Sequence, residues 1–566
     1  MIGGLRAALL CAIAASVPMI ARAQEPPTLL ENARVWTNDD AGPEGTSLLI
    51  VDGRIAAVGT AAVPLEAPAG ATRIDLGGRR VVPGFNDAHT HFFDGAFAVL
   101  APDLLSSDTP EELVRRLEAF VAMQPAGRWI VLNAAWDHER WPGHPLPSRQ
   151  LIDPATPRNP VWMVRPDGHI GLANSLALET AGVDRDTPAP AGGQIDRDDA
   201  GEPTGILRDA AGLVTRAIPR PSEAEYREAL DAGLAHAARL GVTTLQDMCY
   251  DPGAVGVRLL EEYARAGKLT ARFTCQGWLA DWERESRGGR KTGDGDEWVR
   301  VGGLKSFADG GLGASTAYFF EPYEGEAEYR GYLDPMMMPP DTFHARVASA
   351  DRVGFQLVTH AIGDAAISMV LDVYERMAAE SPERDRRWRI EHAQHMATKD
   401  FARMAELGVI ASVQPYHAID DGRWAERKIG PERAKTTYAF RAFLDAGVPL
   451  AFGTDWPVAP LDPMRSIYAA VTRRTLDGAH PEGWVPEEKI DLDEAFAAYT
   501  SGSSYADATE AWKGRLAPGY AADLVVLSED PWTIPAGDLA EVEAVLTIVG
   551  GKVVYRSKEL KETTGG

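Results

Sequence analysis

The stretch VVPGFNDAHTH, residues 81–91, is the most informative part of this 566-residue chain. Two valines lead into Pro83 and Gly84, and the short strand predicted at 85–91 ends in His-x-His. Side chains two positions apart on a strand point to the same face, so His89 and His91 can bind one metal ion together. Neutral imidazole is the commonest metal ligand in proteins. The alternative is two unrelated histidines in a loop, and the rest of the chain decides between them.

Seven further strand-like runs follow, with amphipathic stretches between several of them. One helix is expected to begin at Ser222 with a capping box to Glu225 and to end at Gly241, where a buried strand follows. The eight predicted strands are 85–91, 242–248, 271–277, 301–307, 356–360, 389–392, 409–413 and 450–453. This alternation indicates a (β/α)8 TIM barrel of the α/β class. An open doubly wound sheet shares the periodicity, but no Gly-rich dinucleotide fingerprint follows the first strand.

Short strands are also predicted at both ends of the chain, outside the barrel. They fall at 29–37, 47–51 and 54–58, and again at 523–527, 542–549 and 552–555. We expect residues 24–82 and 511–566 to form one small β-sandwich-like domain, with the barrel at 83–510. The first two barrel strands are about 150 residues apart, far more than a normal connection, which predicts an inserted subdomain at about 95–235.

The N-terminal residues have the pattern of a Sec-type signal peptide. Arg6 precedes the apolar run 7–20, and Ala21-Arg22-Ala23 fits a cleavage site, so the mature chain would begin near Gln24. This predicts a periplasmic or secreted protein with no membrane association after cleavage; an uncleaved anchor is the alternative. The net charge of −25 argues against a nucleic-acid partner. Cys249 and Cys275 would remain, as two free thiols in neighbouring strands or as a single disulfide.

Several further candidate ligands fall within or at the ends of predicted barrel strands. Lys305 lies in the fourth strand, His360 ends the fifth, His392 ends the sixth and Asp455 follows the eighth. A lone histidine or lysine at such a position is usually hydrogen-bonded or solvated. Their joint placement at the carboxyl end of one barrel, where such folds hold their active sites, favours a common metal site with His89 and His91.

With these residues in place, the sequence resembles the amidohydrolase superfamily, and most closely the branch called amidohydrolase family 3, which includes N-substituted formamide deformylases. The resemblance covers nearly all of the mature chain. The matching stretches are 83–91, 165–169 with 174–175, 305–313, 360–365, 391–394, 412–415, 453–457 and 518–523. Together they are specific, although His-x-His alone is not.

The resemblance implies a binuclear metal site. His89 and His91 would hold one ion with Asp455, and His360 with His392 would hold the second. Lys305, carbamylated by CO2, would bridge both ions, because a carbamate offers two anionic oxygens where free lysine is a cation. Zinc accepts such mixed nitrogen and oxygen ligands, with another divalent metal as the alternative. Without the carbamate, a mononuclear site of the histidines and Asp455 is expected.

This site predicts a hydrolase that acts on a small-molecule substrate. A metal ion would activate water and polarise a carbonyl, while Asp455 would accept the proton of the water and pass it to the leaving group. We expect cleavage of a non-peptide C–N bond; a lactonase or esterase is the alternative, and a non-catalytic binding protein is the third reading. A homodimer is expected from the family. Candidate substrate-binding residues are Asp167, His169, Asp309, Gln414, His417 and Trp136.

Overall fold

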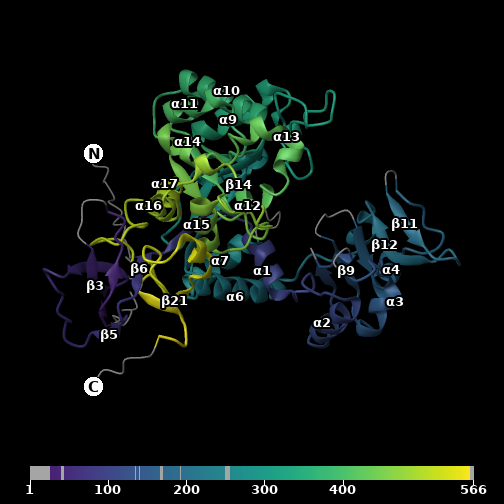
Figure 1. Ribbon diagram of the computed structural model, residues 1–566, viewed down its shortest axis with the longest axis horizontal. Coiled ribbons are helices and arrows are strands. Elements are labelled where there is room, and N and C mark those ends of the chain that lie inside the picture. Colours follow the sequence, from purple (N-terminus) through teal and green to yellow (C-terminus); the bar gives the residue numbers. More distant parts are fainter. Residues whose placement is uncertain are drawn as a thin grey trace, which may run out of the picture.

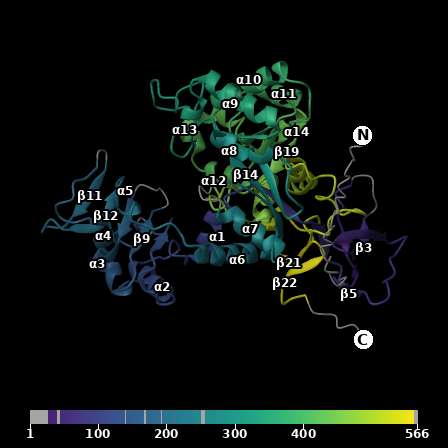
Figure 2. The same cartoon turned by 180° about the vertical axis from the view of Figure 1, so that it is seen from behind.

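The computed structural model describes residues 26–39, 44–133, 135–138, 141–165, 170–190, 193–248 and 255–560. In this part of the chain three bodies are visible: a central barrel, a small β domain and a separate lobe (Figure 1). The two faces of the same arrangement are seen in Figures 1 and 2. No described helix combines the length and the apolar character that a membrane crossing requires. The predicted signal peptide and its cleavage site lie outside the described residues.

The central body is an eight-stranded parallel sheet in the order β19-β18-β17-β16-β15-β14-β13-β7. Its strands are β7 (Phe85–Thr90), β13 (Val242–Asp247), β14 (Arg272–Trp278), β15 (Val299–Phe307), β16 (Leu357–Ala361), β17 (Arg389–His392), β18 (Ile410–Val413) and β19 (Leu450–Phe452). The first and last strands meet just beyond their carboxyl ends, where Asp455 N–H donates to His89 O at 2.7 Å and His91 N–H donates to Trp456 O at 2.8 Å. The predicted TIM barrel is therefore confirmed.

Helices that precede or follow the barrel strands cover the outside of the barrel. They include α6 (Glu223–Arg239), α7 (Val255–Arg265), α9 (Pro340–Val353), α10 (Asp364–Glu380), α11 (Thr398–Leu407), α14 (Phe440–Asp445) and α15 (Pro463–Thr472). The predicted capping box is present at the start of α6, where the Ser222 side chain accepts from the Glu225 N–H and the Glu225 side chain accepts from the Ser222 N–H. Such a cap stabilises a helix by about 1 kcal/mol. It fixes the start of the helix that precedes β13.

The small β domain combines strands from both ends of the chain, as expected. Its nine-stranded sheet has the order β22-β21-β20-β6-β2-β3-β1-β5, with β4 paired to β3. The N-terminal strands are β1 (Thr28–Glu31), β2 (Arg34–Val35), β3 (Gly45–Val51), β4 (Arg54–Thr60), β5 (Thr72–Asp75) and β6 (Arg80–Pro83); the C-terminal ones are β20 (Leu524–Leu527), β21 (Ala544–Val549) and β22 (Lys552–Arg556). At Gly84, between β6 and β7, a Cβ would lie 2.2 Å from the Thr243 hydroxyl, so the close approach of the two bodies requires glycine.

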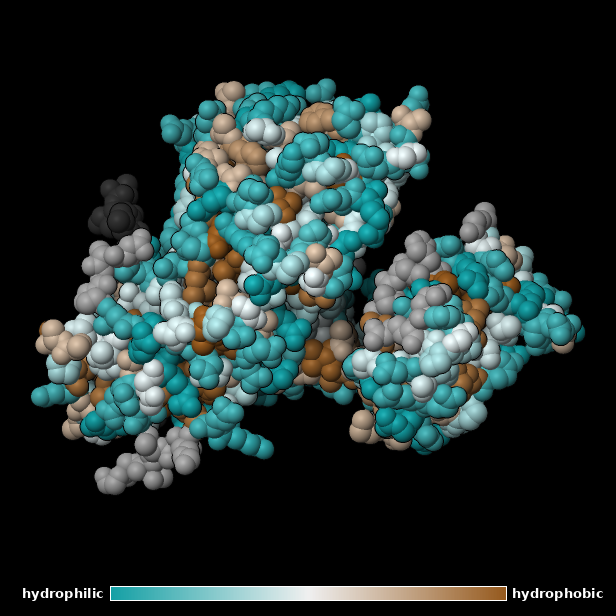
Figure 3. All heavy atoms as spheres, viewed as in Figure 1, coloured by the Kyte–Doolittle hydropathy of each residue, from teal (hydrophilic) through white to brown (hydrophobic). Residues whose placement is uncertain are grey.

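The insert after the first barrel strand forms the separate lobe (Figure 3). It is built on a five-stranded sheet, β11-β12-β10-β9-β8. Its elements are α2 (Pro110–Ala122), β8 (Ile130–Leu132), α3 (Arg149–Ile152), β9 (Val161–Val164), β10 (Ile170–Ala173), α4 (Ser175–Ala181), β11 (Gln194–Arg197), β12 (Pro203–Arg208) and α5 (Gly212–Thr215). The helices that flank it, α1 (Phe92–Leu100) and α6, share one apolar cluster with barrel strands. The elements of the lobe, from α2 to α5, fall within the insert expected at about 95–235.

Cys275 lies in β14 and is a buried free thiol. Cys249 lies outside the described residues.

Candidate metal centre

The six predicted ligands converge on one cavity at the carboxyl end of the barrel. This cavity has a volume of about 300 Å³. The six are His89 at the end of β7, His91 just after it, Lys305 in β15, His360 in β16, His392 at the end of β17 and Asp455 three residues after β19. Parallel strands bring their carboxyl ends to the same rim of a barrel. Residues up to 366 positions apart in the sequence therefore face one space.

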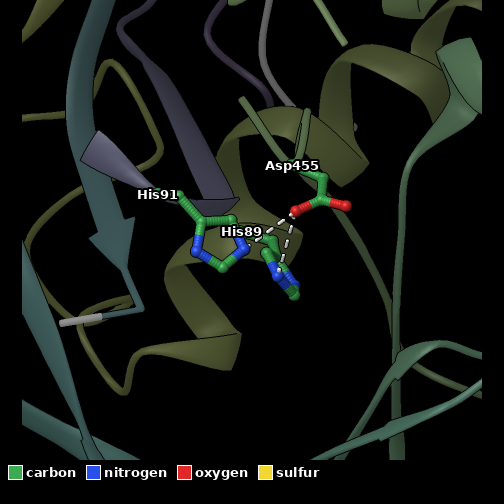
Figure 4. A group of neighbouring side chains, drawn as sticks. All are labelled: His89, His91 and Asp455. Carbon is green, nitrogen blue, oxygen red and sulfur yellow. Dashed lines mark ion pairs between the residues drawn. The ribbon is translucent and has the colours of Figure 1, made fainter. Parts of the chain in front are cut away.

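One donor group within the cavity contains His89, His91 and Asp455 (Figure 4). Oδ1 of Asp455 lies 3.1 Å from Nε2 of His91 and 3.5 Å from Nε2 of His89. One donor atom from each residue lies within 4.8 Å of the others. Oδ1 is buried and forms no hydrogen bond of good geometry with any described residue. A buried oxygen without a donor beside two imidazole nitrogens fits a bound cation, and the mixed nitrogen and oxygen donor set suits zinc.

A buried glutamate, Glu391, orients the first of these histidines. Its Oε2 lies 2.5 Å from Nδ1 of His89, so the opposite ring nitrogen, Nε2, faces the cavity. Glu391 in turn accepts hydrogen bonds from Arg389 and from the Ser412 hydroxyl, each at 2.8 Å. A carboxylate behind a histidine fixes the ring and raises its basicity as a metal ligand. No role was predicted for Glu391 from the sequence, although the alternating charges at 389 and 391 in a buried strand were a signal.

Two of the cavity residues have strained backbone conformations. His392 has φ of 70° and Asp455 has φ of 60°, in the left-handed region that non-glycine residues seldom adopt. The loop before Asp455 is held by Asp87, whose carboxylate accepts from the Thr454 N–H at 2.9 Å and from the Thr454 hydroxyl at 2.7 Å. Burial raises the pKa of Asp87 to about 7. Strain that surrounding contacts maintain is typical of functional sites.

Lys305 is fully buried in the barrel. Its Nζ lies 3.3 Å from Nε2 of His89, and the described residues place no carboxylate in ion-pair contact with it. Burial lowers the pKa of Lys305 to about 8, despite the more distant charges of Glu391 and Asp455. The amine therefore loses its proton far more readily than an exposed lysine would.

Three histidines of the cavity, His89, His360 and His392, are neutral at physiological pH. Burial, and then the charge of Lys305, lower the pKa of His89 to about 4 and that of His360 to about 3. Burial also lowers the pKa of His392 well below its ordinary value. Burial alone would raise the pKa of Asp455. The neighbouring histidines, His89 foremost, have the larger and opposite effect, so the pKa lies below its ordinary value and the carboxylate stays ionised. Neutral imidazole and carboxylate are the forms that bind metals.

The remaining cavity wall contains residues that the sequence analysis did not assign. Gln394, Asp420 and Asp421 are polar, whereas Phe307, Ile362 and Val458 are apolar. The Asp421 carboxylate accepts from Gln394 Nε2 at 3.0 Å and from the Tyr438 hydroxyl at 2.6 Å. The two aspartates are the last residues of α12 (Pro415–Asp421), the helix after β18 that also contains His417. Only their place after a barrel strand could have identified them.

The residues predicted to bind substrate lie in several places. His417 lines the cavity, whereas Gln414 and Asp309 are buried next to it and Trp136 lies in the core of the insert. Asp309 accepts hydrogen bonds from the N–H groups of Tyr318, Ile362 and Gly363, and so joins two loops; burial raises its pKa to about 7. Asp167 and His169 lie outside the described residues.

Comparison with known proteins places this site in a family. The profile of the amidohydrolase family matches residues 72–555. The Arabidopsis thaliana protein LONG AFTER FAR-RED 3 is 38% identical over 93% of this chain and 91% of its own length. An N-substituted formamide deformylase from Arthrobacter pascens is 30% identical over 93% of this chain and 98% of its own length.

A solved structure agrees with the sequence relatives. An uncharacterized metal-dependent hydrolase from Pyrococcus horikoshii has a TM-score of 0.75 and 27% identity, and the match covers 90% of this chain and 99% of that one. Its described activity class fits the cluster of histidines and Asp455 in the cavity. The chain belongs to the amidohydrolase family, and its site is that of a metal-dependent hydrolase.

Proposed function

We propose that the protein hydrolyses a non-peptide C–N bond, of the amide or formamide type, with two zinc ions. The observation that carries this proposal is the convergence of six candidate ligands on one cavity, three of which already have donor atoms within 4.8 Å of one another. The choice of a C–N bond follows the formamide deformylase, which is similar over nearly its whole length. Fold and ligands alone do not determine the bond that is broken.

The residues present fit such a centre. His89, His91 and Asp455 would hold one ion, His360 and His392 the second, and a carbamate on Lys305 would join both. Ions bound there would supply a Lewis acid that polarises the substrate carbonyl and makes water more acidic. Glu391 would keep Nε2 of His89 directed to the cavity, as its 2.5 Å contact with Nδ1 supports.

Asp455 is the group that would move a proton. Its carboxylate lines the cavity and stays ionised, so it could accept the proton of the attacking water. The same proton would then pass to the leaving nitrogen as the C–N bond breaks, which gives an amine and a carboxylic acid. The products balance the substrate and one water molecule.

The burial of Lys305 supports its proposed modification. A protonated amine without a carboxylate partner is costly in a buried position, so the neutral amine is favoured. Attack of the neutral amine on CO2 forms an N–C bond and releases one proton, which leaves an anionic carbamate. Intact-protein mass spectrometry under native conditions would show a gain of one CO2, and Lys305→Met would abolish that gain.

A substrate panel tests the reaction class. Purified protein, with its metal content measured by mass spectrometry, would be assayed with formamides, N-acyl amines, lactones and aryl esters. We expect turnover of formamides or N-acyl amines. Turnover of lactones or esters alone would overturn the C–N assignment in favour of a lactonase or esterase. Protein that stays metal-free and inert on every class after zinc addition would point to a binding protein.

We also propose that the protein is exported by its N-terminal signal. The support is the sequence pattern of residues 1–23. Expression of the full chain in a Gram-negative host, fractionation and N-terminal sequencing would test this. A periplasmic product that begins near Gln24 is expected, and a cytoplasmic product that keeps Met1 would contradict export.

A further inference from the structure

His417 has a ring nitrogen that the fold leaves without a partner. The residue lies in α12, directly after β18, and lines the metal cavity. Its Nε2 is buried and forms no hydrogen bond with any described residue. A buried polar atom without a partner costs free energy, and native proteins seldom retain one unless a ligand or water completes it.

A nearby histidine shows what a structural role looks like in the same region. His395 follows β17 and is buried against the same part of the barrel. Its Nδ1 contacts the Thr437 hydroxyl at 2.8 Å, and its Nε2 contacts Gln394 Nε2 at 3.0 Å. Both of its ring nitrogens are therefore occupied by the protein. In His417, by contrast, Nε2 has no partner among the described residues, and the side chain lines the metal cavity.

The position of His417 matches that of a metal ligand. His392, His417 and Asp455 each offer a donor atom, and these three atoms lie within 4.8 Å of one another. The rings of His392 and His417 are nearly parallel, with an interplanar angle of 9° and centroids 6.5 Å apart. This is a second donor group, which shares Asp455 with the group of His89 and His91.

His360, the other residue expected at the second ion, is already engaged by the protein. Its Nε2 lies 3.2 Å from the carbonyl oxygen of Gly310 and 3.8 Å from Oδ1 of Asp309. Only its other ring nitrogen remains for a metal. His360 thus offers one nitrogen from a ring that Gly310 orients. Without a carbamate on Lys305, His360 and His392 give the second ion two protein donors, one fewer than catalytic zinc sites have.

We propose that His417 is a direct ligand of the second metal ion, together with His392 and with Asp455 shared between the two ions. The inference rests on the proposed two-metal function. His417, which was predicted to bind substrate, would then belong to the metal centre. It would add a ligand from a helix to the ligands at the strand ends. It also gives the second ion a set of protein ligands that does not depend on carbamylation of Lys305.

Metal binding by His417→Ala tests the proposal without relying on turnover. Wild type, His417→Ala and a control, His344→Ala, would be stripped of metal and titrated with Co²⁺, with the bound ions counted by mass spectrometry and the ligand environment read from the visible absorption spectrum. His344 is paired with Glu380 outside the cavity, so its variant removes an imidazole away from the site. We expect two ions in wild type and in the control, and a second ion bound at least 10–100-fold more weakly in His417→Ala.

Thermal unfolding separates loss of a ligand from loss of the fold. Because Nε2 of His417 has no protein partner, metal-free His417→Ala should unfold at nearly the wild-type temperature, and only the rise caused by metal should shrink. His417→Gln, which keeps a polar side chain of similar size, serves as a second variant if the alanine protein is unstable.

The outcomes distinguish this inference from the proposed function. Wild-type protein that binds no metal would overturn the two-metal function and the inference with it. Wild-type protein that binds metal, with His417→Ala and His417→Gln showing the same stoichiometry, affinity and Co²⁺ spectrum, would overturn the role of His417 alone.

Discussion

The two ends of the barrel differ in whether their buried charged side chains have partners within the protein. At the end where the strands begin, Arg272 donates two hydrogen bonds to Asp523, at 2.7 and 3.0 Å, and Lys513 donates to Asp507 at 2.8 Å. At the end where the strands finish, the described residues place no carboxylate in ion-pair contact with Lys305, and Oδ1 of Asp455 forms no hydrogen bond of good geometry with any of them. Charges that are satisfied stabilise a fold, whereas charges left unsatisfied are available to a ligand.

The satisfied end also joins two parts of the molecule. Arg272 begins β14 of the barrel, and Asp523 precedes β20 of the small β domain. The guanidinium of Arg272 further packs over the rings of Trp298 and Trp512, with centroid distances of 4.6 and 5.2 Å. Residues at this end therefore bind the small domain to the barrel. We therefore expect substitutions here to change stability, and substitutions at the cavity to change metal binding and turnover.

The largest expected effect is on turnover, at Asp455. Asp455→Asn keeps an oxygen near the histidines but removes the group that accepts the proton. We expect kcat to fall by about 10²–10⁴-fold, the usual contribution of a general base, with metal still largely bound and the unfolding temperature close to wild type. Steady-state kinetics and metal analysis measure both. Full activity in a variant that retains its metal would remove Asp455 from the proposed role.

A substitution at the opposite end, where the strands begin, should lower stability and leave turnover and metal binding unchanged. Asp523→Ala leaves Arg272 buried without its carboxylate, which destabilises a protein by about 3–5 kcal/mol. The denaturant midpoint should fall by a corresponding amount, while kcat per folded molecule and metal stoichiometry stay near wild type. Arg376→Ala, which removes an exposed ion pair with Asp341, is the control and should change stability by less than about 1 kcal/mol. Selective loss of metal from Asp523→Ala would contradict the division between the two ends.

The barrel itself was largely predictable from the sequence. The sixth strand was predicted at Arg389–His392 and lies there, and the fourth, predicted from Val301, begins at Val299. Short apolar runs that end at a polar group are strong signals because every barrel strand is buried on both faces. The candidate ligands could be placed because a strand end fixes which rim a residue faces.

Other parts of the site depended on contacts that no local pattern contains. The role of Glu391 requires β17 and β7 to bring its carboxylate to His89, 302 positions away. The place of Asp421 in the cavity wall depends on Gln394 and Tyr438, which come from two other segments. Trp136 was expected near substrate, yet its indole N–H bonds Met163 O within the insert. The sequence shows that an insert exists but not how it packs.

Glu391 is a buried carboxylate with hydrogen-bond partners, yet it orients His89 at the metal cavity. Glu391→Gln keeps the shape but weakens the hold on His89 Nδ1. We expect metal affinity to fall by about 10–100-fold, as for other carboxylates behind ligating histidines, with kcat recovered at saturating zinc. Competition with a chelator measures the affinity. Unchanged affinity would mean that packing alone orients His89.

The smallest expected effect is a pH dependence confined to the satisfied end. Burial by itself raises the pKa of Asp523, but Arg272, the Gly550 N–H and Lys513 lower it more, so the pKa lies below its ordinary value. A carboxylate with a lowered pKa contributes stability that is present above its unfolded pKa, about 3.9, and is lost as the pH falls through the folded value. In metal-free protein, the gap in unfolding free energy between wild type and Asp523→Asn should therefore be constant from pH 5 to 8 (roughly) and narrow below about pH 4. Metal-free samples are needed because protonation of the cavity histidines would otherwise release metal in the same acid range. A gap that narrows between pH 6 and 8 would place the titrating group among the cavity residues and not at the Arg272–Asp523 pair.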